Sequence, residues 1–203
     1  MPSFEVKNVT YHHLNYPSVS FQAGSTTFLT GPSGVGKSTL FKLLNGVITP
    51  TSGQIFYDGQ LIETYDALAL RRQVLLIGQM ATLFDDLTII DNFHQFFDYR
   101  QLAPLADDDV RRFLTICCLD MPLSKNVHEL SGGEKQRVFI AIHLALGFDV
   151  LMMDEPTSAL DQTNSHGVME NIKAYCESLN KTLLVISHDE ALTRAFATEV
   201  VRL

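Results

Sequence analysis

The chain contains the stretch Gly31-Pro32-Ser33-Gly34-Val35-Gly36-Lys37-Ser38-Thr39, which fits the pattern G-x-x-x-x-G-K-[ST] at every position. Glycines allow a chain to curl until successive backbone N–H groups converge on one anion. A strand-like run at 26–30 precedes the stretch and an apolar helix is expected at 38–45. The positive end of that helix would point at the same anion, so the sequence predicts a phosphate-binding loop.

This loop also supplies two side chains that can act on a bound nucleoside triphosphate. Lys37 can reach the β- and γ-phosphates, and the hydroxyl of Ser38 can bind Mg²⁺. The strand before the loop and the helix after it argue against the alternative, a glycine-rich turn that binds nothing. The pattern is that of P-loop NTPases and does not select a family among them.

Three further apolar runs lie at 74–77, 150–153 and 183–186. Each is continuous rather than alternating, which is typical of strands that a mainly parallel sheet buries on both faces. Residues 4–30 alternate in short pieces instead and predict an N-terminal antiparallel β-layer. The expected fold class is therefore α/β, with a P-loop NTPase core.

The apolar spacing becomes helical from about 87 to 146, which predicts a helical subdomain inserted into this core. We therefore expect a single domain of residues 1–203. Its core takes residues 1–86 and 147–203, and its helical subdomain takes about 87–146.

Two adjacent acids, Asp154 and Glu155, end the apolar run at 150–153. A strand tip delivers both carboxylates to the edge of the sheet where ligands gather in open α/β folds. Asp154 would hold Mg²⁺ through its water shell, and Glu155 would orient and polarise the attacking water. The alternative is an ordinary acidic turn between a strand and a loop.

A second candidate for anion binding reads Leu130-Ser131-Gly132-Gly133-Glu134-Lys135-Gln136-Arg137 at the start of a helical run. A hydroxyl, two glycines and a helix N-terminus with free N–H groups can face a phosphate. One chain then holds two phosphate-facing helix starts and needs only one. The second would serve a nucleotide bound by another copy of the protein; the alternative is a plain helix that Ser131 caps.

Together these motifs resemble those of the ATP-binding cassette (ABC) ATPases over nearly the whole chain. The sequence LSGGEKQR is similar to the family's signature, and it precedes a strand that ends in DEPTSALD. The resemblance implies ATP and Mg²⁺ as cofactors and a head-to-tail homodimer. Each ATP would lie between the phosphate loop of one subunit and the Ser131-Gly132-Gly133 segment of the other.

Several further residues gain a role only from this resemblance. Gln79 resembles the Q-loop glutamine, which contacts Mg²⁺ and supports catalysis; Asp161 resembles the D-loop aspartate. His188 resembles the switch histidine that contacts the γ-phosphate. Residues 79–87 would be the surface that docks a membrane permease, and the run at 81–87 is similar to that of metal (iron) exporters.

The sequence departs from the family pattern at two places. The family places an aromatic near the N-terminus to stack on adenine, and here Tyr11, His13 and Tyr16 compete. We favour Tyr11, with packing in the β-layer as its alternative role. After the signature, family members often have Ala-Arg-Ala-Leu where this chain reads Ala141-Ile142-His143-Leu144, so any polar contact of that arginine is missing.

Charge and composition limit the remaining functions. The formal net charge is −8 and no basic face is evident, which argues against a nucleic-acid partner. Residues 1–7 lack the basic start and apolar run of a signal peptide, and three cysteines form no CxxC motif. We expect a cytoplasmic ATPase, peripheral on the inner face of the membrane through a permease. The rival is a soluble, non-transport ABC ATPase, for example of the iron–sulfur assembly type.

Overall fold

The computed structural model describes residues 2–203, whose contacts divide them into two compact units. We call the first the core unit; it holds the residues up to Ile77, Phe148–Glu155 and Cys176–Leu203. We call the second the helical unit; it holds Gly78–Gly147 and Pro156–Tyr175. No helix among residues 2–203 combines the length and the apolar character needed to cross a bilayer.

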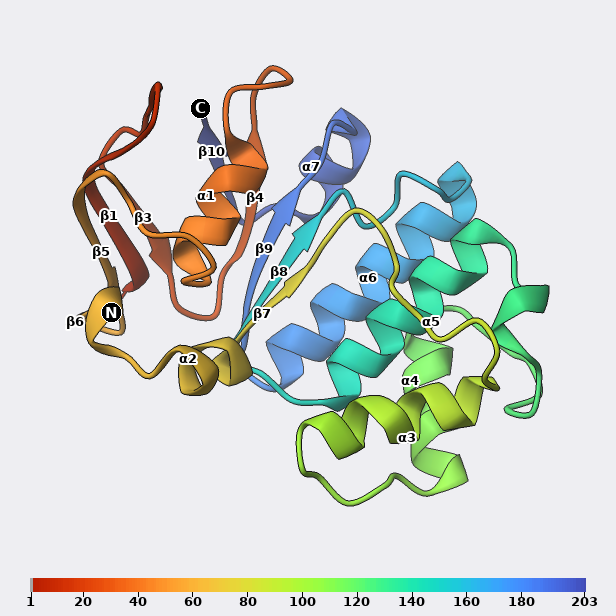
Figure 1. Cartoon of the computed structure of the whole chain (residues 1–203). Helices are drawn as coiled ribbons and strands as arrows, with labels where there is room; N and C mark the ends of the chain where they lie inside the picture. Colours follow the sequence, from red (N-terminus) through yellow and green to blue (C-terminus); the bar gives the residue numbers. More distant parts are fainter. Residues whose placement is uncertain (1) are drawn as a thin grey trace. The chain divides into compact units, whose positions relative to one another are not determined.

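A parallel five-stranded sheet forms the centre of the core unit (Figure 1). Its strands run in the order β10 (Glu199–Arg202), β4 (Thr26–Thr30), β9 (Thr182–Ile186), β8 (Val150–Asp154) and β7 (Val74–Ile77). All five residues of β9 are buried, as its unbroken apolar sequence predicts for a strand covered on both faces. The predicted α/β class with a mainly parallel sheet is confirmed.

The predicted antiparallel layer is the second sheet of the core unit. It consists of β1 (Pro2–Tyr11), β2 (Leu14–Asn15), β3 (Val19–Gln22), β5 (Ser52–Tyr57) and β6 (Gln60–Leu61). Phe4 and Val6 are buried while Lys7 is exposed, which is the alternation of a half-buried strand. The strand β5 was not predicted, because the first half of it is polar and exposed and only Ile55 and Tyr57 are buried.

Helix α1 (Lys37–Leu44) packs between the two sheets (Figure 1). Leu40 and Phe41 share one buried cluster with Phe4 of the layer and with Met152 and Ile186 of the parallel sheet. Burial of a large apolar side chain contributes about 1.5–3 kcal/mol, so this cluster fixes the helix that follows the phosphate loop. The remaining elements of the core unit are η1 (Ile62–Thr64), α2 (Ala67–Gln73) and α7 (Glu190–Phe196).

The helical unit contains α3 (Ile89–Tyr99), α4 (Asp107–Ile116), η2 (Val127–Glu129), α5 (Gly132–Ala145) and most of α6 (Gln162–Ser178). It begins at Gly78, earlier than the boundary at about 87 that the sequence suggested, because Phe84 is hydrogen-bonded to Asn92 of α3. It also takes in Pro156–Tyr175, which we had placed in the core. The reason is contact between α6 and α4: Asn171 donates to the carbonyl of Ile116 at 3.1 Å.

Candidate functional site

A cavity of about 350 Å³ in the core unit brings together much of the phosphate loop with Glu155 and His188. It lies at the carboxyl ends of β4, β8 and β9, the edge at which open α/β sheets bind ligands. Its lining consists of His13, Leu14, Ser33, Gly34, Gly36, Lys37, Ser38, Thr39, Glu155, Ile186 and His188.

The curled loop between β4 and α1 depends on glycine. Gly34 and Gly36 have φ values of 80° and 99°, which side chains rarely tolerate. A Cβ on Gly36 would also lie 2.7 Å from the hydroxyl of Tyr16. That hydroxyl donates to the carbonyl of Gly36 at 3.0 Å, so Tyr16 supports the loop from beneath.

Lys37 is the first residue of α1 and is only 6% exposed, yet it lines the cavity. Its ammonium group donates to the carbonyl of Gly31 at 2.8 Å and to that of Pro32 at 3.0 Å. A buried cation is stable only with such partners. The two carbonyls therefore hold a positive charge at the start of the helix, beside the N–H groups of its first turn.

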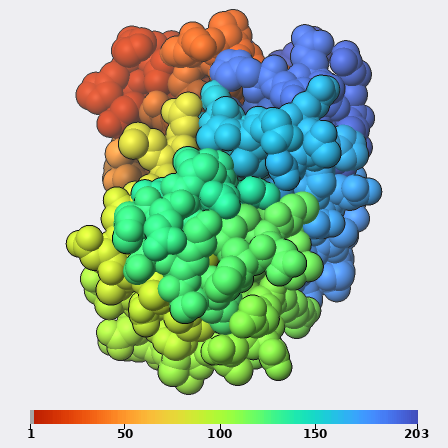
Figure 2. Space-filling model, turned by 90° about the vertical axis from the view of Figure 1, so that its right-hand side faces the viewer, coloured from red at the N-terminus to blue at the C-terminus, as the bar shows by residue number. Residues whose placement is uncertain are grey.

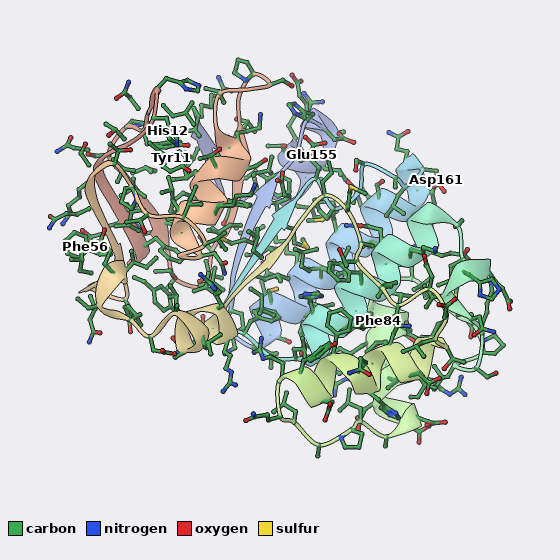
Figure 3. The ribbon with its side chains drawn as sticks, in the orientation of Figure 1. Tyr11, His12, Phe56, Phe84, Glu155 and Asp161 are labelled. Atoms are coloured by element: carbon green, nitrogen blue, oxygen red, sulfur yellow. The ribbon has the colours of Figure 1, made fainter. Side chains whose placement is uncertain are left out.

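Glu155 follows β8 and brings a carboxylate to the cavity (Figure 3). Its φ of 51° is unusual for a residue with a side chain. The N–H of Glu155 donates to the carbonyl of Ile186 in β9 at 3.0 Å, which holds this backbone in place. Nε2 of His188 lies 3.1 Å from Oε1 of Glu155, so a carboxylate and an imidazole meet in one cavity.

Ser131 is the N-cap of α5 in the helical unit and caps it through a reciprocal pair of hydrogen bonds. Its hydroxyl accepts from the N–H of Glu134 at 3.3 Å, and its own N–H donates to the Glu134 carboxylate at 2.8 Å. The second bond is the main reason why the pKa of Glu134 is lowered. Capping, which the sequence offered as the alternative role of Ser131, is thus present in the structure. It leaves the other free N–H groups of the first turn available.

Gly133, two positions after Ser131, lies close to the segment that follows β8. A Cβ on Gly133 would lie 2.9 Å from the carbonyl oxygen of Ala159. Asp161 accepts from the backbone N–H of Asn164 at 2.9 Å, and this bond is the first cause of its lowered pKa. Figure 3 shows Asp161 at the start of α6.

A family model described as "ABC transporter" matches residues 14–158. The chain belongs to this family. Among its relatives is the "Probable iron export ATP-binding protein FetA" of Escherichia coli K12, 39% identical over 93% of this chain and 86% of that protein. Another is the "Petrobactin import ATP-binding protein YclP" of Bacillus subtilis, 33% identical over 98% of this chain and 82% of that protein.

Solved structures agree with this assignment. The ABC transporter cassette MJ0796, determined as a dimer, superposes with a TM-score of 0.85 at 26% identity and covers 98% of this chain and 94% of its own. The same cassette has been solved in a post-hydrolysis state bound to ADP and Pi. The present chain is therefore an ABC ATPase that binds and hydrolyses ATP.

The structure separates the three candidates for the base-stacking residue of this ABC ATPase. Tyr16 is buried under the phosphate loop, and Tyr11 packs against the core cluster with its ring 4.4 Å from that of His12 (Figure 3). His13 lines the cavity, and Tyr11, which the sequence favoured, does not. The alternation of β1 turns Tyr11 toward the core, and His12, with a φ of 51°, redirects the chain before His13.

Two other sequence candidates lie where their motifs place them. Gln79 is exposed in the loop that follows β7. Asp154 is the last residue of β8, is half-buried, and pairs in register with Ile186. Sequence reasoning missed Leu14 as a lining residue and Tyr16 as a support of the loop, because neither belongs to a motif.

Proposed function

We propose that this ABC ATPase is the nucleotide-hydrolysing subunit of a transporter, in which two copies close around two Mg-ATP and drive a separate membrane permease. The observation that carries the proposal is the cavity in which the buried Lys37, the Glu155 carboxylate and the His188 imidazole meet. The dimeric structure of the related MJ0796 cassette supports the closure of two copies. The names of the relatives, which include an export and an import protein, support transport over the rival assembly function.

In this proposal the cavity residues act on the phosphates, the base and the attacking water. Lys37 and the N–H groups of the loop bind the β- and γ-phosphates, and His13 contacts the base. Glu155 orients the attacking water and withdraws its proton, which requires an ionised carboxylate near the γ-phosphate. His188 positions the Glu155 carboxylate and can donate to the γ-phosphate.

Two oxygen donors of the core unit fit Mg²⁺, which prefers oxygen ligands. Ser38 offers a hydroxyl in the phosphate loop and Asp154 a carboxylate at the end of β8, while a role for Gln79 of the helical unit rests on the resemblance to the Q-loop alone. When bound, the ion would neutralise charge on the β- and γ-phosphates. In the dimer, the Ser131-Gly132-Gly133 helix start of one copy would face the γ-phosphate held by the other copy.

We expect His13→Ala to lower the affinity for ATP by about tenfold, because stacking on a base is worth about 1–3 kcal/mol. Tyr11→Ala is the matched control: it removes a packed ring outside the cavity, so it should lower the melting temperature more than the affinity. Titration calorimetry and thermal melts measure the two effects. If Tyr11→Ala weakens the affinity for ATP and His13→Ala leaves it unchanged, Tyr11 rather than His13 binds the base.

We expect the permease to dock on residues 79–87, where Phe84 is 37% exposed and its ring contacts those of Phe96 and Tyr99. Exposed aromatic side chains are frequent anchors of interfaces. Phe84→Asp should therefore abolish co-sedimentation of the tagged chain with membranes while its cooperative melt and ATP binding persist. Leu68→Asp, at a residue 66% exposed on α2, is the control and should leave co-sedimentation, the cooperative melt and ATP binding unchanged.

The same experiment tests transport against its rivals. Co-purification of a polytopic membrane protein from detergent extracts, lost in Phe84→Asp, is the expected result. Co-purification of a soluble scaffold protein, retained in Phe84→Asp, would favour the iron–sulfur assembly function. Loss of the cooperative melt in Phe84→Asp would show that Phe84 is a core residue of the helical unit and would refute the docking role.

A further inference from the structure

We propose that the ion pair between Asp85 and Lys135 is a positioning contact that ties the docking loop (residues 79–87) to α5, the helix that Ser131 caps. The proposal rests on the proposed function, in which these two places serve the permease and the partner subunit's ATP. Neither residue contacts the nucleotide in that scheme. Their role is to hold the two surfaces in a fixed relation within the helical unit.

The docking loop is first anchored to α3 through its backbone. The N–H of Phe84 donates to the side-chain oxygen of Asn92 at 2.8 Å, and the amide nitrogen of Asn92 donates to the carbonyl of Phe84 at 3.1 Å. Asn92 is fully buried, so these bonds are shielded from water. The backbone of Phe84 is thus held in place by α3.

The loop is joined next to the segment that leads into α5. Lys135 donates to the Asp85 carboxylate at 2.6 Å, while the carbonyl of Asp85 accepts from the N–H of His128 at 3.1 Å. The carbonyl of Leu87 accepts from the N–H of Val127 at 3.0 Å. Figure 2 shows the yellow docking loop at the surface of the helical unit, near the green segment that precedes and begins α5.

A chain of rings provides a second connection to the same helix. The ring centroid of Phe96 lies 6.1 Å from that of Phe84 and 5.9 Å from that of Phe139 in α5. Aromatic pairs of this kind contribute about 0.5–1.5 kcal/mol each beyond their burial. The rings meet α5 past its first turn, whereas the ion pair meets it in the first turn.

Lys135 lies next to the capping box that fixes Ser131. Its backbone N–H donates to the carbonyl of Ser131 at 2.9 Å, and its neighbour Glu134 exchanges two hydrogen bonds with Ser131. A displacement of Asp85 therefore reaches Ser131 through one ion pair and one helical turn. Because the side chains of Lys135 and Asp85 are 27% and 62% exposed, the pair contributes little to stability, and its effect should be on position.

Charge reversal tests this role in the intact chain. We expect Asp85→Lys and Lys135→Asp each to accelerate hydrogen–deuterium exchange severalfold at the amides of residues 134–137, with the melting temperature nearly unchanged. In the double variant Asp85→Lys with Lys135→Asp, the attraction returns with the charges exchanged and the exchange rates should recover. Asp86→Lys is the matched control, since Asp86 is exposed and makes no ion pair among residues 2–203.

The same variants, each combined with Glu155→Gln to slow turnover, show whether the ion pair supports dimerisation of the chain. Each single reversal should raise the concentration of chain needed for ATP-dependent dimerisation by about tenfold, and the double reversal should restore it. Binding of ATP to the monomer should not change. Equal behaviour of Asp85→Lys and Asp86→Lys, or no recovery in the double variant, would overturn the proposal.

The exchange measurement keeps this proposal separate from the proposed function. If Glu155→Gln alone forms no dimer with ATP, the proposed function fails, while the exchange rates still decide whether the ion pair positions the start of α5. Unchanged exchange in both single variants would refute the positioning role even where dimers form.

Discussion

Replacement of Lys37 by alanine should abolish tight binding of Mg-ATP. The side chain is the buried cation of the cavity and lies where the β- and γ-phosphates would bind. Removal of one partner from a buried charge pair costs about 2–5 kcal/mol, which corresponds to a loss of affinity of about thirtyfold to several thousandfold. At millimolar ATP the variant should therefore show a much smaller rise in melting temperature than the unmodified chain.

The unmodified chain provides the reference for this experiment. A ligand that binds only the folded state at a hundred times its Kd stabilises that state by about 2.7 kcal/mol. Lys42→Ala, at an exposed lysine of the same helix, should retain the full shift. No shift in the unmodified chain at millimolar Mg-ATP would contradict the assignment of the cavity itself.

Replacement of Glu155 by glutamine should leave ATP binding intact and remove most turnover. The amide is nearly isosteric, but it cannot withdraw a proton from water as a carboxylate does, and general base catalysis contributes about 10²–10⁴-fold. Nucleotide that binds but is not hydrolysed should hold two copies together. We therefore expect an ATP-dependent dimer by light scattering and a rate of phosphate release lowered by at least about a hundredfold.

A nearby acid serves as the control. Glu190→Gln alters an exposed carboxylate on α7, outside the cavity, and should hydrolyse ATP at the rate of the unmodified chain. If Glu155→Gln also keeps that rate, Glu155 is not the catalytic base, and His188 is the next candidate.

The elements that could be located from sequence alone are determined by residues close to one another in the chain. The strands β4 and β7 were predicted with their observed bounds. Every position of β7 is apolar, as expected for a strand buried on both faces, whereas β4 was located by the phosphate loop that follows it. The phosphate loop was equally clear, since its glycines are required by local backbone geometry. Such features are specified by neighbours in the chain.

The features that sequence reasoning missed depend on contacts between distant residues. The placement of His13 rather than Tyr11 in the cavity follows from the turn at His12 and from packing of Tyr11 against the core. The edge strand β10 was missed because its residues alternate in burial and it has only four of them. The loop before α3 joins the helical unit through hydrogen bonds between Phe84 and Asn92. No local sequence pattern predicts these bonds.

The order of the parallel sheet has a consequence for how the protein is made. The strand β4, which carries the phosphate loop, lies between β9 and β10, the last two strands in the sequence. During synthesis β4 leaves the ribosome well before β9 and β10, which follow it along the chain. Until both have emerged, the apolar residues and backbone groups of β4 stay unpaired, a condition that favours aggregation and slow folding. The nascent chain thus acquires its nucleotide pocket only after β9 and β10 have been synthesised, so ATP binding reports that the parallel sheet has assembled.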